Sequence, residues 1–494
     1  MKSPAQPLDH SGHCVSTRLR RISRRLLLPV ALLLPALMLL LMASCSKQET
    51  RSAEPNAAAE AVPAPKPTTV TLATTKALAA ASSTCTAPAA WFPSTQTPEP
   101  NPDINFNSFC AFHQWAWQSM LWLTQSDGSG QMRFESFPSA QEVVSGQESS
   151  DGNALQLRPR TTKSDRVPDS MNEINQAGQG GILVDHQGRV IYYSQHVNQA
   201  MFTDIESQGW NQPSVLNSMP PTVEFKTGDV ELKAAWKIVS PGEDVSGLIV
   251  RSAEVDKLVN RNGSITTDPT QPLQVKVALV GFHIVGWVNG HPEAIWATFE
   301  YRNNAPDYAP KQSTDAAVSA SNFLFYTANT KAIECNQLNS AVLKLDEATQ
   351  TLSPVTQVCR QFPSGMVAGT TEPNNDVPNL AAITQLNASV LKQLESGSLL
   401  KNYFEVGAEW TTGVTSPPTF VPNSTLQDTL VGSRLLGNAV IETFNQQVQS
   451  QNNCFSCHNT MMFNPSDPKV PPMQGTNISL SHIILRAYLD NQNK

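Results

Sequence analysis

The sequence is poor in charge. Only 15% of its 494 residues are Asp, Glu, Lys or Arg, whereas 40% are hydrophobic. A chain of this composition can bury a sizeable core, which excludes a disordered acidic or basic protein. Its 36 prolines exclude a long coiled coil, because proline interrupts helices. The chain shows no internal repeat, and its length predicts one large domain or two.

Basic charge is especially scarce beyond the N-terminus. The formal net charge is −7, and without residues 1–44 the chain has 28 basic and 40 acidic residues. Proteins that bind nucleic acids need a basic surface to contact phosphates. We therefore expect no nucleic-acid partner.

Residues 26–44 contain no charge and follow a basic cluster. Their length is about that needed to cross a bilayer. The stretch ends in Leu41-Met42-Ala43-Ser44-Cys45, which resembles a bacterial lipoprotein signal whose Cys receives the lipid. We predict a signal peptide over 1–44 and lipidation at Cys45, on the periplasmic side of the cell envelope. Ser46 favours the outer membrane; an ordinary cleaved signal and a retained membrane helix are the alternatives.

Four of the eight cysteines lie outside both the N-terminal segment and the motif described next: Cys85, Cys110, Cys335 and Cys359. An even number in an oxidising compartment favours disulfide bonds. Three pairings are possible. We predict the local one, Cys85–Cys110 and Cys335–Cys359, and four buried free thiols are the alternative.

The strongest chemical signal is Cys454-Phe455-Ser456-Cys457-His458, the pattern of c-type haem attachment. Positions i, i+3 and i+4 share one face of a helical turn, so both thiols and the imidazole point the same way. The thiols can form thioethers to the haem vinyl groups while His458 ligates the iron. Zinc is a weaker alternative, because no second Cys/His pair of suitable spacing completes four ligands; a redox dithiol is another. We predict one covalent haem c.

The second axial ligand of the iron is less defined by the sequence. Met461 and Met462 follow His458 too closely to reach the opposite haem face. Met473, in a proline-rich segment 15 residues after His458, is the first candidate, because that length can pass around a porphyrin. His482, on a predicted short C-terminal helix, is the second. A distant His or an open iron site remain alternatives.

The body of the chain mixes strands with helices. Apolar residues at three- and four-residue spacing predict an amphipathic helix over 106–121, in which His113 is expected to be a core residue. A short hairpin is predicted around residues 185–188. Asn289-Gly290 predicts a clearer one between residues 275–288 and 293–301. Two polar residues of that hairpin, His283 and Glu300, are interpreted either as buried partners of each other or as functional groups.

The predicted domain organisation follows from these signals. Residues 45–84 are rich in Ala, Pro and Thr and form a tether, because such a segment cannot bury a core. Residues 85–425 form a β-rich body with several helices, and residues 426–494 a small helical haem-binding segment packed against it. Leu436, Val440, Phe444 and Val448 step by four and predict a helix leading into the haem motif. The expected fold class is α+β.

Several blocks of the chain, taken in order, carry a resemblance. They are Trp115-Ala116-Trp117-Gln118, Glu231-Leu232-Lys233-Ala234-Ala235-Trp236, Gly281-Phe282-His283-Ile284-Val285, Ile295-Trp296-Ala297-Thr298-Phe299-Glu300, Asn304-Ala305-Pro306 and the Cys-x-x-Cys-His motif. Together they resemble a poorly characterised family of exported bacterial monohaem c-type cytochrome-like proteins; Tyr301 stands where that family would have His. The resemblance implies haem c and export, and it supplies no reaction.

Two classes of function follow. The first is a membrane-anchored cytochrome that transfers electrons to a periplasmic redox partner. The second is a haem enzyme or small-ligand sensor, peroxidase-like, with an open distal site; the large body favours it, because electron transfer alone needs less protein. A haem-bearing structural lipoprotein is a third reading.

Overall fold

The computed structural model describes residues 84–128, 130–146, 155–157, 174–309, 311–338, 341–362, 377–411, 430–447, 452–465 and 467–492. The predicted signal, the lipid site at Cys45, the tether up to residue 83 and the boundary near residue 425 lie outside these ranges. No helix within them is long and apolar enough to cross a membrane.

The described residues contain ten strands and six α-helices, and eight of the strands form one sheet. The strands are β1 (Leu155–Leu157), β2 (Ile191–Val197), β3 (Val230–Ile238), β4 (Val250–Arg261), β5 (Ser264–Val288), β6 (His291–Tyr301), β7 (Lys344–Asp346), β8 (Thr351–Ser353), β9 (Tyr403–Thr411) and β10 (Leu430–Gly432). The α-helices are α1 (Phe109–Leu123), α2 (Ala140–Ser145), α3 (Gln199–Gln208), α4 (Pro213–Leu216), α5 (Val377–Gln393) and α6 (His482–Asp490).

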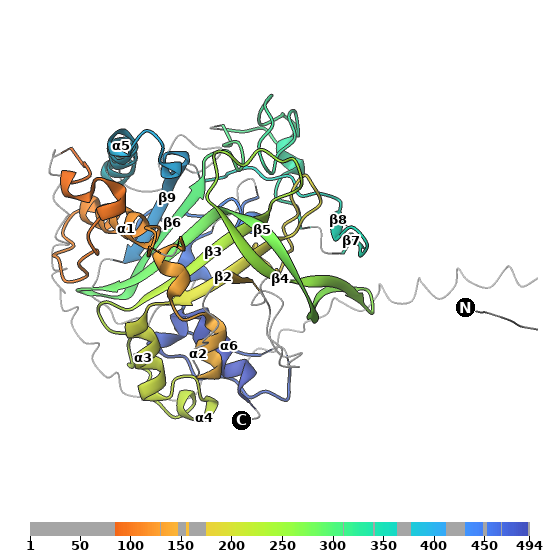
Figure 1. The fold of residues 1–494 in the computed structure, drawn as a ribbon. Helices are drawn as coiled ribbons and strands as arrows, with labels where there is room; N and C mark the ends of the chain where they lie inside the picture. Colours follow the sequence, from red (N-terminus) through yellow and green to blue (C-terminus); the bar gives the residue numbers. More distant parts are fainter. Residues whose placement is uncertain are drawn as a thin grey trace, which may run out of the picture. The chain divides into compact units, whose positions relative to one another are not determined.

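The large sheet has the order β1-β4-β5-β6-β9-β10, with β3 paired to β5 and β2 paired to β3. All its pairs are antiparallel except the parallel pair β1–β4. β5 is long enough to pair with β4 along its first half and with β3 and β6 along its second. In Figure 1, α1 and α5 lie together beside β9, and α2, α3, α4 and α6 gather at one end of the sheet. The predicted α+β class with a β-rich body is confirmed.

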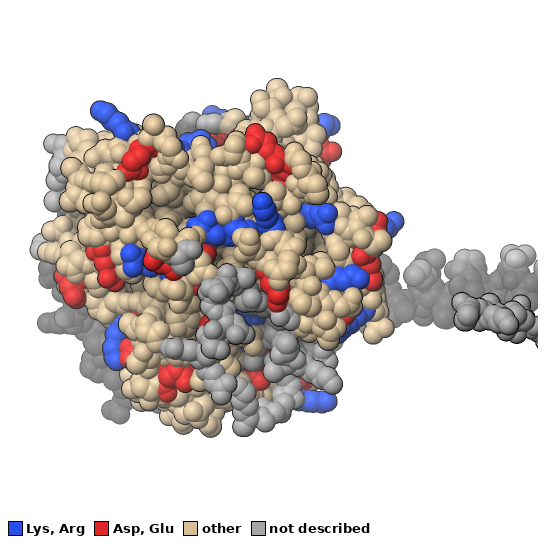
Figure 2. Space-filling view, in the orientation of Figure 1, with Lys and Arg blue, Asp and Glu red and all other residues tan. Residues whose placement is uncertain are grey.

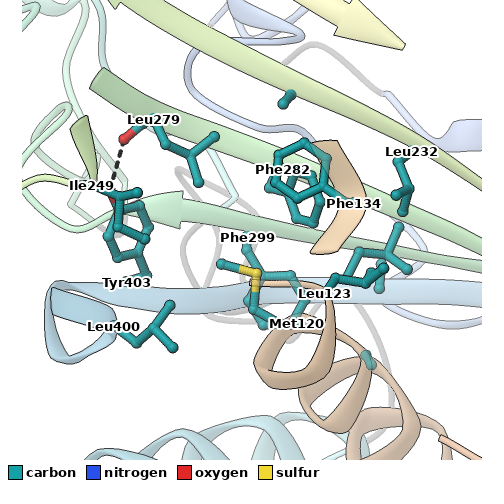
Figure 3. Packing of buried hydrophobic residues seen from close by; sticks show 14 of the residues in the cluster. Met120, Leu123, Phe134, Leu232, Ile249, Leu279, Phe282, Phe299, Leu400 and Tyr403 are labelled. Atoms are coloured by element: carbon teal, nitrogen blue, oxygen red, sulfur yellow. Dashed lines mark hydrogen bonds between the residues drawn. The ribbon is translucent and has the colours of Figure 1, made fainter. Parts of the chain in front are cut away.

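One face of the sheet, which we call the helical face, packs against α1 and α5. Its side chains are almost all apolar, and Figure 3 shows Met120 of α1 beside Phe299 of β6, and Phe282 of β5 beside Phe134. The hydroxyl of Tyr403 donates a 2.8 Å hydrogen bond to the Leu279 carbonyl in the same region. The predicted helix over 106–121 is therefore confirmed as α1, two to three residues further along the chain.

The opposite face, which we call the C-terminal face, is covered by residues 433–447 and by the segment from residue 452 to α6. Gly281 of β5 and Gly407 of β9 have no side chain, so residues 433–447 can pack closely against these strands. An added Cβ would lie 2.6 Å from Val440 Cγ2 at Gly281 and 2.4 Å from Ser433 Oγ at Gly407. β10 extends the sheet beside β9, so residues near the C-terminus belong to the sheet itself.

The predicted helix across Leu436, Val440 and Phe444 is wrong. These residues lie in turns, with only a 3-10 turn at Thr443–Asn445, and Val448 lies outside the described residues. Asn438 explains the outcome, because its amide nitrogen donates to Thr298 Oγ1 and to the Phe299 carbonyl, both at 2.9 Å. The apolar steps of four reflect contact with the sheet. Among the described residues after 452, α6 is the one α-helix.

Both predicted disulfide bonds are present. Cys85–Cys110 ties the start of the described chain to α1, and Cys335–Cys359 closes a loop beyond β6. The predicted hairpin of β5 and β6 is confirmed by its antiparallel pairing. The hairpin around residues 185–188 is shorter than predicted, with Val184 paired to Val190 before β2 begins.

Candidate haem-attachment site

The Cys-x-x-Cys-His motif forms a single turn, as its spacing predicts. A 3-10 helix covers Cys454–Ser456, and the Cys454 carbonyl accepts from the N–H groups of Cys457 at 3.2 Å and His458 at 2.9 Å. Asn453 caps this turn by accepting the Ser456 N–H at 2.8 Å. Cys454 and Cys457 are the only free cysteines among the described residues. The two thiols and the imidazole are thus available on one turn.

The ring of His458 is held by three contacts. Its Nδ1 lies 2.8 Å from the Leu480 carbonyl and donates to it, which leaves Nε2 with the lone pair. The indole of Trp296 lies 4.3 Å from the imidazole between ring centres, and the His482 ring stacks on it at 3.8 Å. Burial, and then the neighbouring His482, hold the pKa of His458 well below its usual value. The ring is therefore neutral, which is the form that ligates metals. The hydrogen bond from Nδ1 to the Leu480 carbonyl sets its orientation.

The two thiols are protonated at neutral pH. Burial, reinforced by the charge of Glu409, raises the pKa of Cys454 far above its usual range. Burial and Glu442 raise the pKa of Cys457, against the opposing effect of Lys233. Glu409 Oε2 also accepts the Cys454 N–H at 2.7 Å, so β9 fixes the position of the turn.

A row of ionisable side chains lies under the motif on the C-terminal face. Glu231 of β3 aligns across β5 and β6 with Trp296 and Glu409, and Lys233 aligns with His283 one step along. Burial raises the pKa of Glu231 to about 7 and that of Glu409 to about 8. Burial lowers the pKa of Lys233 to about 8, although nearby carboxylates oppose the shift. These shifts are large because the C-terminal segment removes water from the row.

The candidate axial ligands are both near the motif but differ in placement. Met473 is fully buried in the same apolar cluster as Phe455, and its backbone pairs with Phe463 through bonds of 2.9 and 3.0 Å. His482 begins α6 and lies face to face with His458. The two rings are 3.8 Å apart between centres and 22° from parallel, so they are stacked. Which of Met473 and His482 would be the second ligand stays a prediction. Met461 is exposed.

The other predicted candidates lie elsewhere. His113 is confirmed as a core residue: its Nδ1 donates to Glu405 at 2.6 Å and its Nε2 to Asn379 at 2.8 Å. His283 and Glu300 are not partners of each other, so that alternative is wrong. His283 lies 3.3 Å from Glu442, and Glu300 pairs with Arg360 at 3.0 Å. In the pairing of β5 with β6, His283 lies opposite Thr298 and Glu300 lies opposite Gly281, so the two side chains are offset by two residues.

Sequence reasoning missed the residues that surround the motif. Trp296 contacts the His458 ring, Glu409 holds the Cys454 amide, and Glu231 accepts from Ser481 at the start of α6. The available signal was an ionisable residue within a strongly apolar strand, as in β3 and β9. Such residues are rare in buried strands and mark either a buried pair or a site.

No protein-family model matches this chain, and no curated protein or solved structure shows significant similarity to it. The resemblance to monohaem c-type proteins therefore stays a prediction. The residues present fit a covalent haem on two observations: two free thiols on one turn, and a His458 whose Nδ1 donates to the Leu480 carbonyl, so that Nε2 carries the lone pair. Those residues would hold the group, which would supply one-electron redox chemistry.

Proposed function

We propose that this protein is an exported, membrane-anchored monohaem c-type cytochrome that transfers electrons. The observation that carries the proposal is the turn bearing Cys454, Cys457 and His458, with the imidazole oriented by the Leu480 carbonyl. Orientation of a ligating histidine by a second hydrogen bond is general in metal sites. Two strand residues also hold that turn: Trp296 of β6 contacts the His458 ring, and Glu409 of β9 accepts the Cys454 N–H.

The covalent attachment is tested by replacing Cys454 and Cys457 together with Ser in a host that exports and matures haem c. We expect the double variant to lose haem staining on a denaturing gel, since no thiol remains to form a thioether. Ser456→Ala, a change within the same turn, should stain fully. Full staining of the double variant would exclude this attachment site.

The second axial ligand is tested by Met473→Ala and His482→Ala. We keep Met473 as the first candidate because it is fully buried in the apolar cluster that contains Phe455 of the motif, whereas His482 stacks on the His458 ring. A thioether ligand raises the reduction potential, so Met473→Ala should lower the potential and allow carbon monoxide to bind ferrous iron. His482→Ala should leave both unchanged. The reverse pattern would assign the ligand to His482.

A haem enzyme or small-ligand sensor with an open distal site is the second candidate. The observation that favours it is the group Lys233, His283 and Glu442 near Cys457, which could move protons at an open iron site. Ready binding of carbon monoxide by the unmodified protein would select this function. A spectrum unchanged by carbon monoxide would select electron transfer.

The localisation is proposed from the N-terminal sequence alone. Lipidation at Cys45 would place the folded part on the periplasmic side, bound to the membrane through its lipid and a tether. We expect Cys45→Ala to move the protein from the membrane fraction to the soluble periplasmic fraction. Retention in the membrane fraction would show that residues 26–44 remain as a membrane helix.

A further inference from the structure

A second group of reactive side chains lies where β3 ends, outside the haem-attachment motif. Lys237 of β3 is buried, with 2% of its side chain exposed. Its Nζ lies 2.8 Å from Asp185 Oδ2 and 2.6 Å from Glu243 Oε1. The side chain of Asp185 is 0% exposed and that of Glu243 is 13% exposed. An amine is thus held between two carboxylates away from bulk water, an arrangement with a large desolvation cost.

The carboxyl group of Asp185 is held asymmetrically. Its Oδ1 accepts two backbone N–H groups, from Gln187 and Arg189, each at 2.8 Å, within the turn before β2. Its Oδ2 has no hydrogen-bond partner although Lys237 Nζ lies 2.8 Å away, so that contact lacks the angles of a hydrogen bond. Oδ1 therefore accepts two hydrogen bonds, whereas Oδ2 lies next to an amine that is not hydrogen-bonded to it.

We propose that Lys237 and Asp185 join in an intramolecular amide (isopeptide) bond, with Glu243 as the proton carrier. Glu243 takes a proton from the ammonium group, and the neutral Nζ attacks Cγ of Asp185. The N–H groups of Gln187 and Arg189 stabilise the negative charge that develops on Oδ1, as donors of an oxyanion hole do.

The step balances without an oxidant or a reductant. The C–N bond forms and the bond from Cγ to Oδ2 breaks. Two of the three ammonium protons pass by way of Glu243 to Oδ2, which leaves as water, and the third stays on the amide nitrogen. Glu243 ends as it began. It and Arg189 line an open hollow of about 720 Å³ through which the water can leave.

The physical reason for the reaction is the removal of buried charge. An ammonium and a carboxylate that have lost most of their solvation are replaced by one neutral amide. Proximity also favours the reaction, because the folded chain holds the amine and the carboxyl group within van der Waals contact. Glu243 keeps the Ser240 N–H as a donor at 3.0 Å after the reaction. The product ties the turn before β2 covalently to the end of β3.

The test is a peptide map of the purified, exported full-length protein after denaturation and trypsin digestion. We expect residues 167–189 and 234–251 to be recovered as one branched peptide, lighter than the two separate peptides by one water, with no cleavage after Lys237. Recovery of the two segments as separate linear peptides, cleaved after Lys237, would overturn the proposal.

Two variants and an internal control sharpen the result. Lys237→Arg keeps the positive charge but cannot form this amide, so it should give only separate peptides. Glu243→Gln removes the proton carrier and should abolish most of the branched peptide; an undiminished yield would exclude the assigned role of Glu243. Lys226 also contacts Asp204, but its side chain is 67% exposed, and this pair should remain unlinked. A link there would show unspecific condensation and overturn the proposed site.

Discussion

The two faces of the large sheet are built from the same strands but differ in chemistry. In β3, Leu232, Ala234 and Trp236 point to the helical face, whereas Glu231 and Lys233 point to the C-terminal face. The helical face is closed by the apolar sides of α1 and α5. The C-terminal face is closed by a largely irregular segment that carries the Cys-x-x-Cys-His motif.

The helical face of the sheet therefore contributes mainly to stability, whereas the C-terminal face carries the ionisable groups. Burial of apolar surface stabilises the helical face without requiring particular partners. On the C-terminal face, burial moves the pKa of Glu231, Lys233 and Glu409 away from the usual values, because charged forms lose their hydration there. On the side of the molecule drawn in Figure 2, Lys, Arg, Asp and Glu are scattered over a mainly uncharged surface.

The largest effect is expected from removing a core side chain of the helical face. Trp117 is fully buried, lies edge-on to Phe299 at 5.0 Å and donates to Asn387 at 2.8 Å. Trp117→Ala should lower the free energy of unfolding by about 3–5 kcal/mol, measured by urea titration. Trp122→Ala, on the half-buried side of α1, should lower it by less. Equal losses would contradict the assignment of stability to this face.

A smaller effect is expected from the ion pair between His113 of α1 and Glu405 of β9. Burial by itself lowers the pKa of His113, but Glu405 and Asn379 outweigh it and raise the pKa above 6.5. The folded protein then binds the proton more tightly than the unfolded chain does. The stabilisation is complete below pH 6.5 and is lost as the pH rises through the folded-state pKa.

Glu405→Gln should therefore cost about 2–3 kcal/mol of unfolding free energy at low pH, because the charge that holds the imidazolium is removed. The difference between variant and unmodified protein should shrink as the pH rises. Urea titrations at a series of pH values measure this trend. A difference that grows with pH would show that His113 is neutral in the folded protein.

The smallest effect is expected where the C-terminal segment lies on the sheet. Gly281→Ala would place a Cβ 2.6 Å from Val440 Cγ2 and 3.0 Å from Asn438 Oδ1. We expect a loss of about 1–3 kcal/mol in unfolding free energy and faster proteolysis of the segment, because the chain must move outward. Gly397→Ala meets no atom within 4 Å and should leave stability unchanged or raise it by about 0.5 kcal/mol. Equal behaviour of the two variants would mean that residues 433–447 are not held against β5.

The elements with strong local signals were predictable. Apolar spacing in α1, the Asn289-Gly290 turn between β5 and β6, and the short sequence separations of the two disulfides were sufficient. The segment from Leu436 to Phe444 was mispredicted because its spacing imitates a helix while its backbone follows the sheet. Local pattern does not distinguish contact with a sheet from contact along a helix when the segment is short.

The sequence by itself determined the turn of the Cys-x-x-Cys-His motif, since residues at i, i+3 and i+4 share one side of a turn wherever it lies. It also determined which residues of β3 would separate onto opposite faces, because strand side chains alternate. Only the tertiary structure decided what surrounds those residues. Trp296 meets His458, Glu409 meets Cys454 and Asp185 meets Lys237 through strand register and the path of the C-terminal segment. These depend on contacts between residues far apart in the chain, which no local pattern specifies.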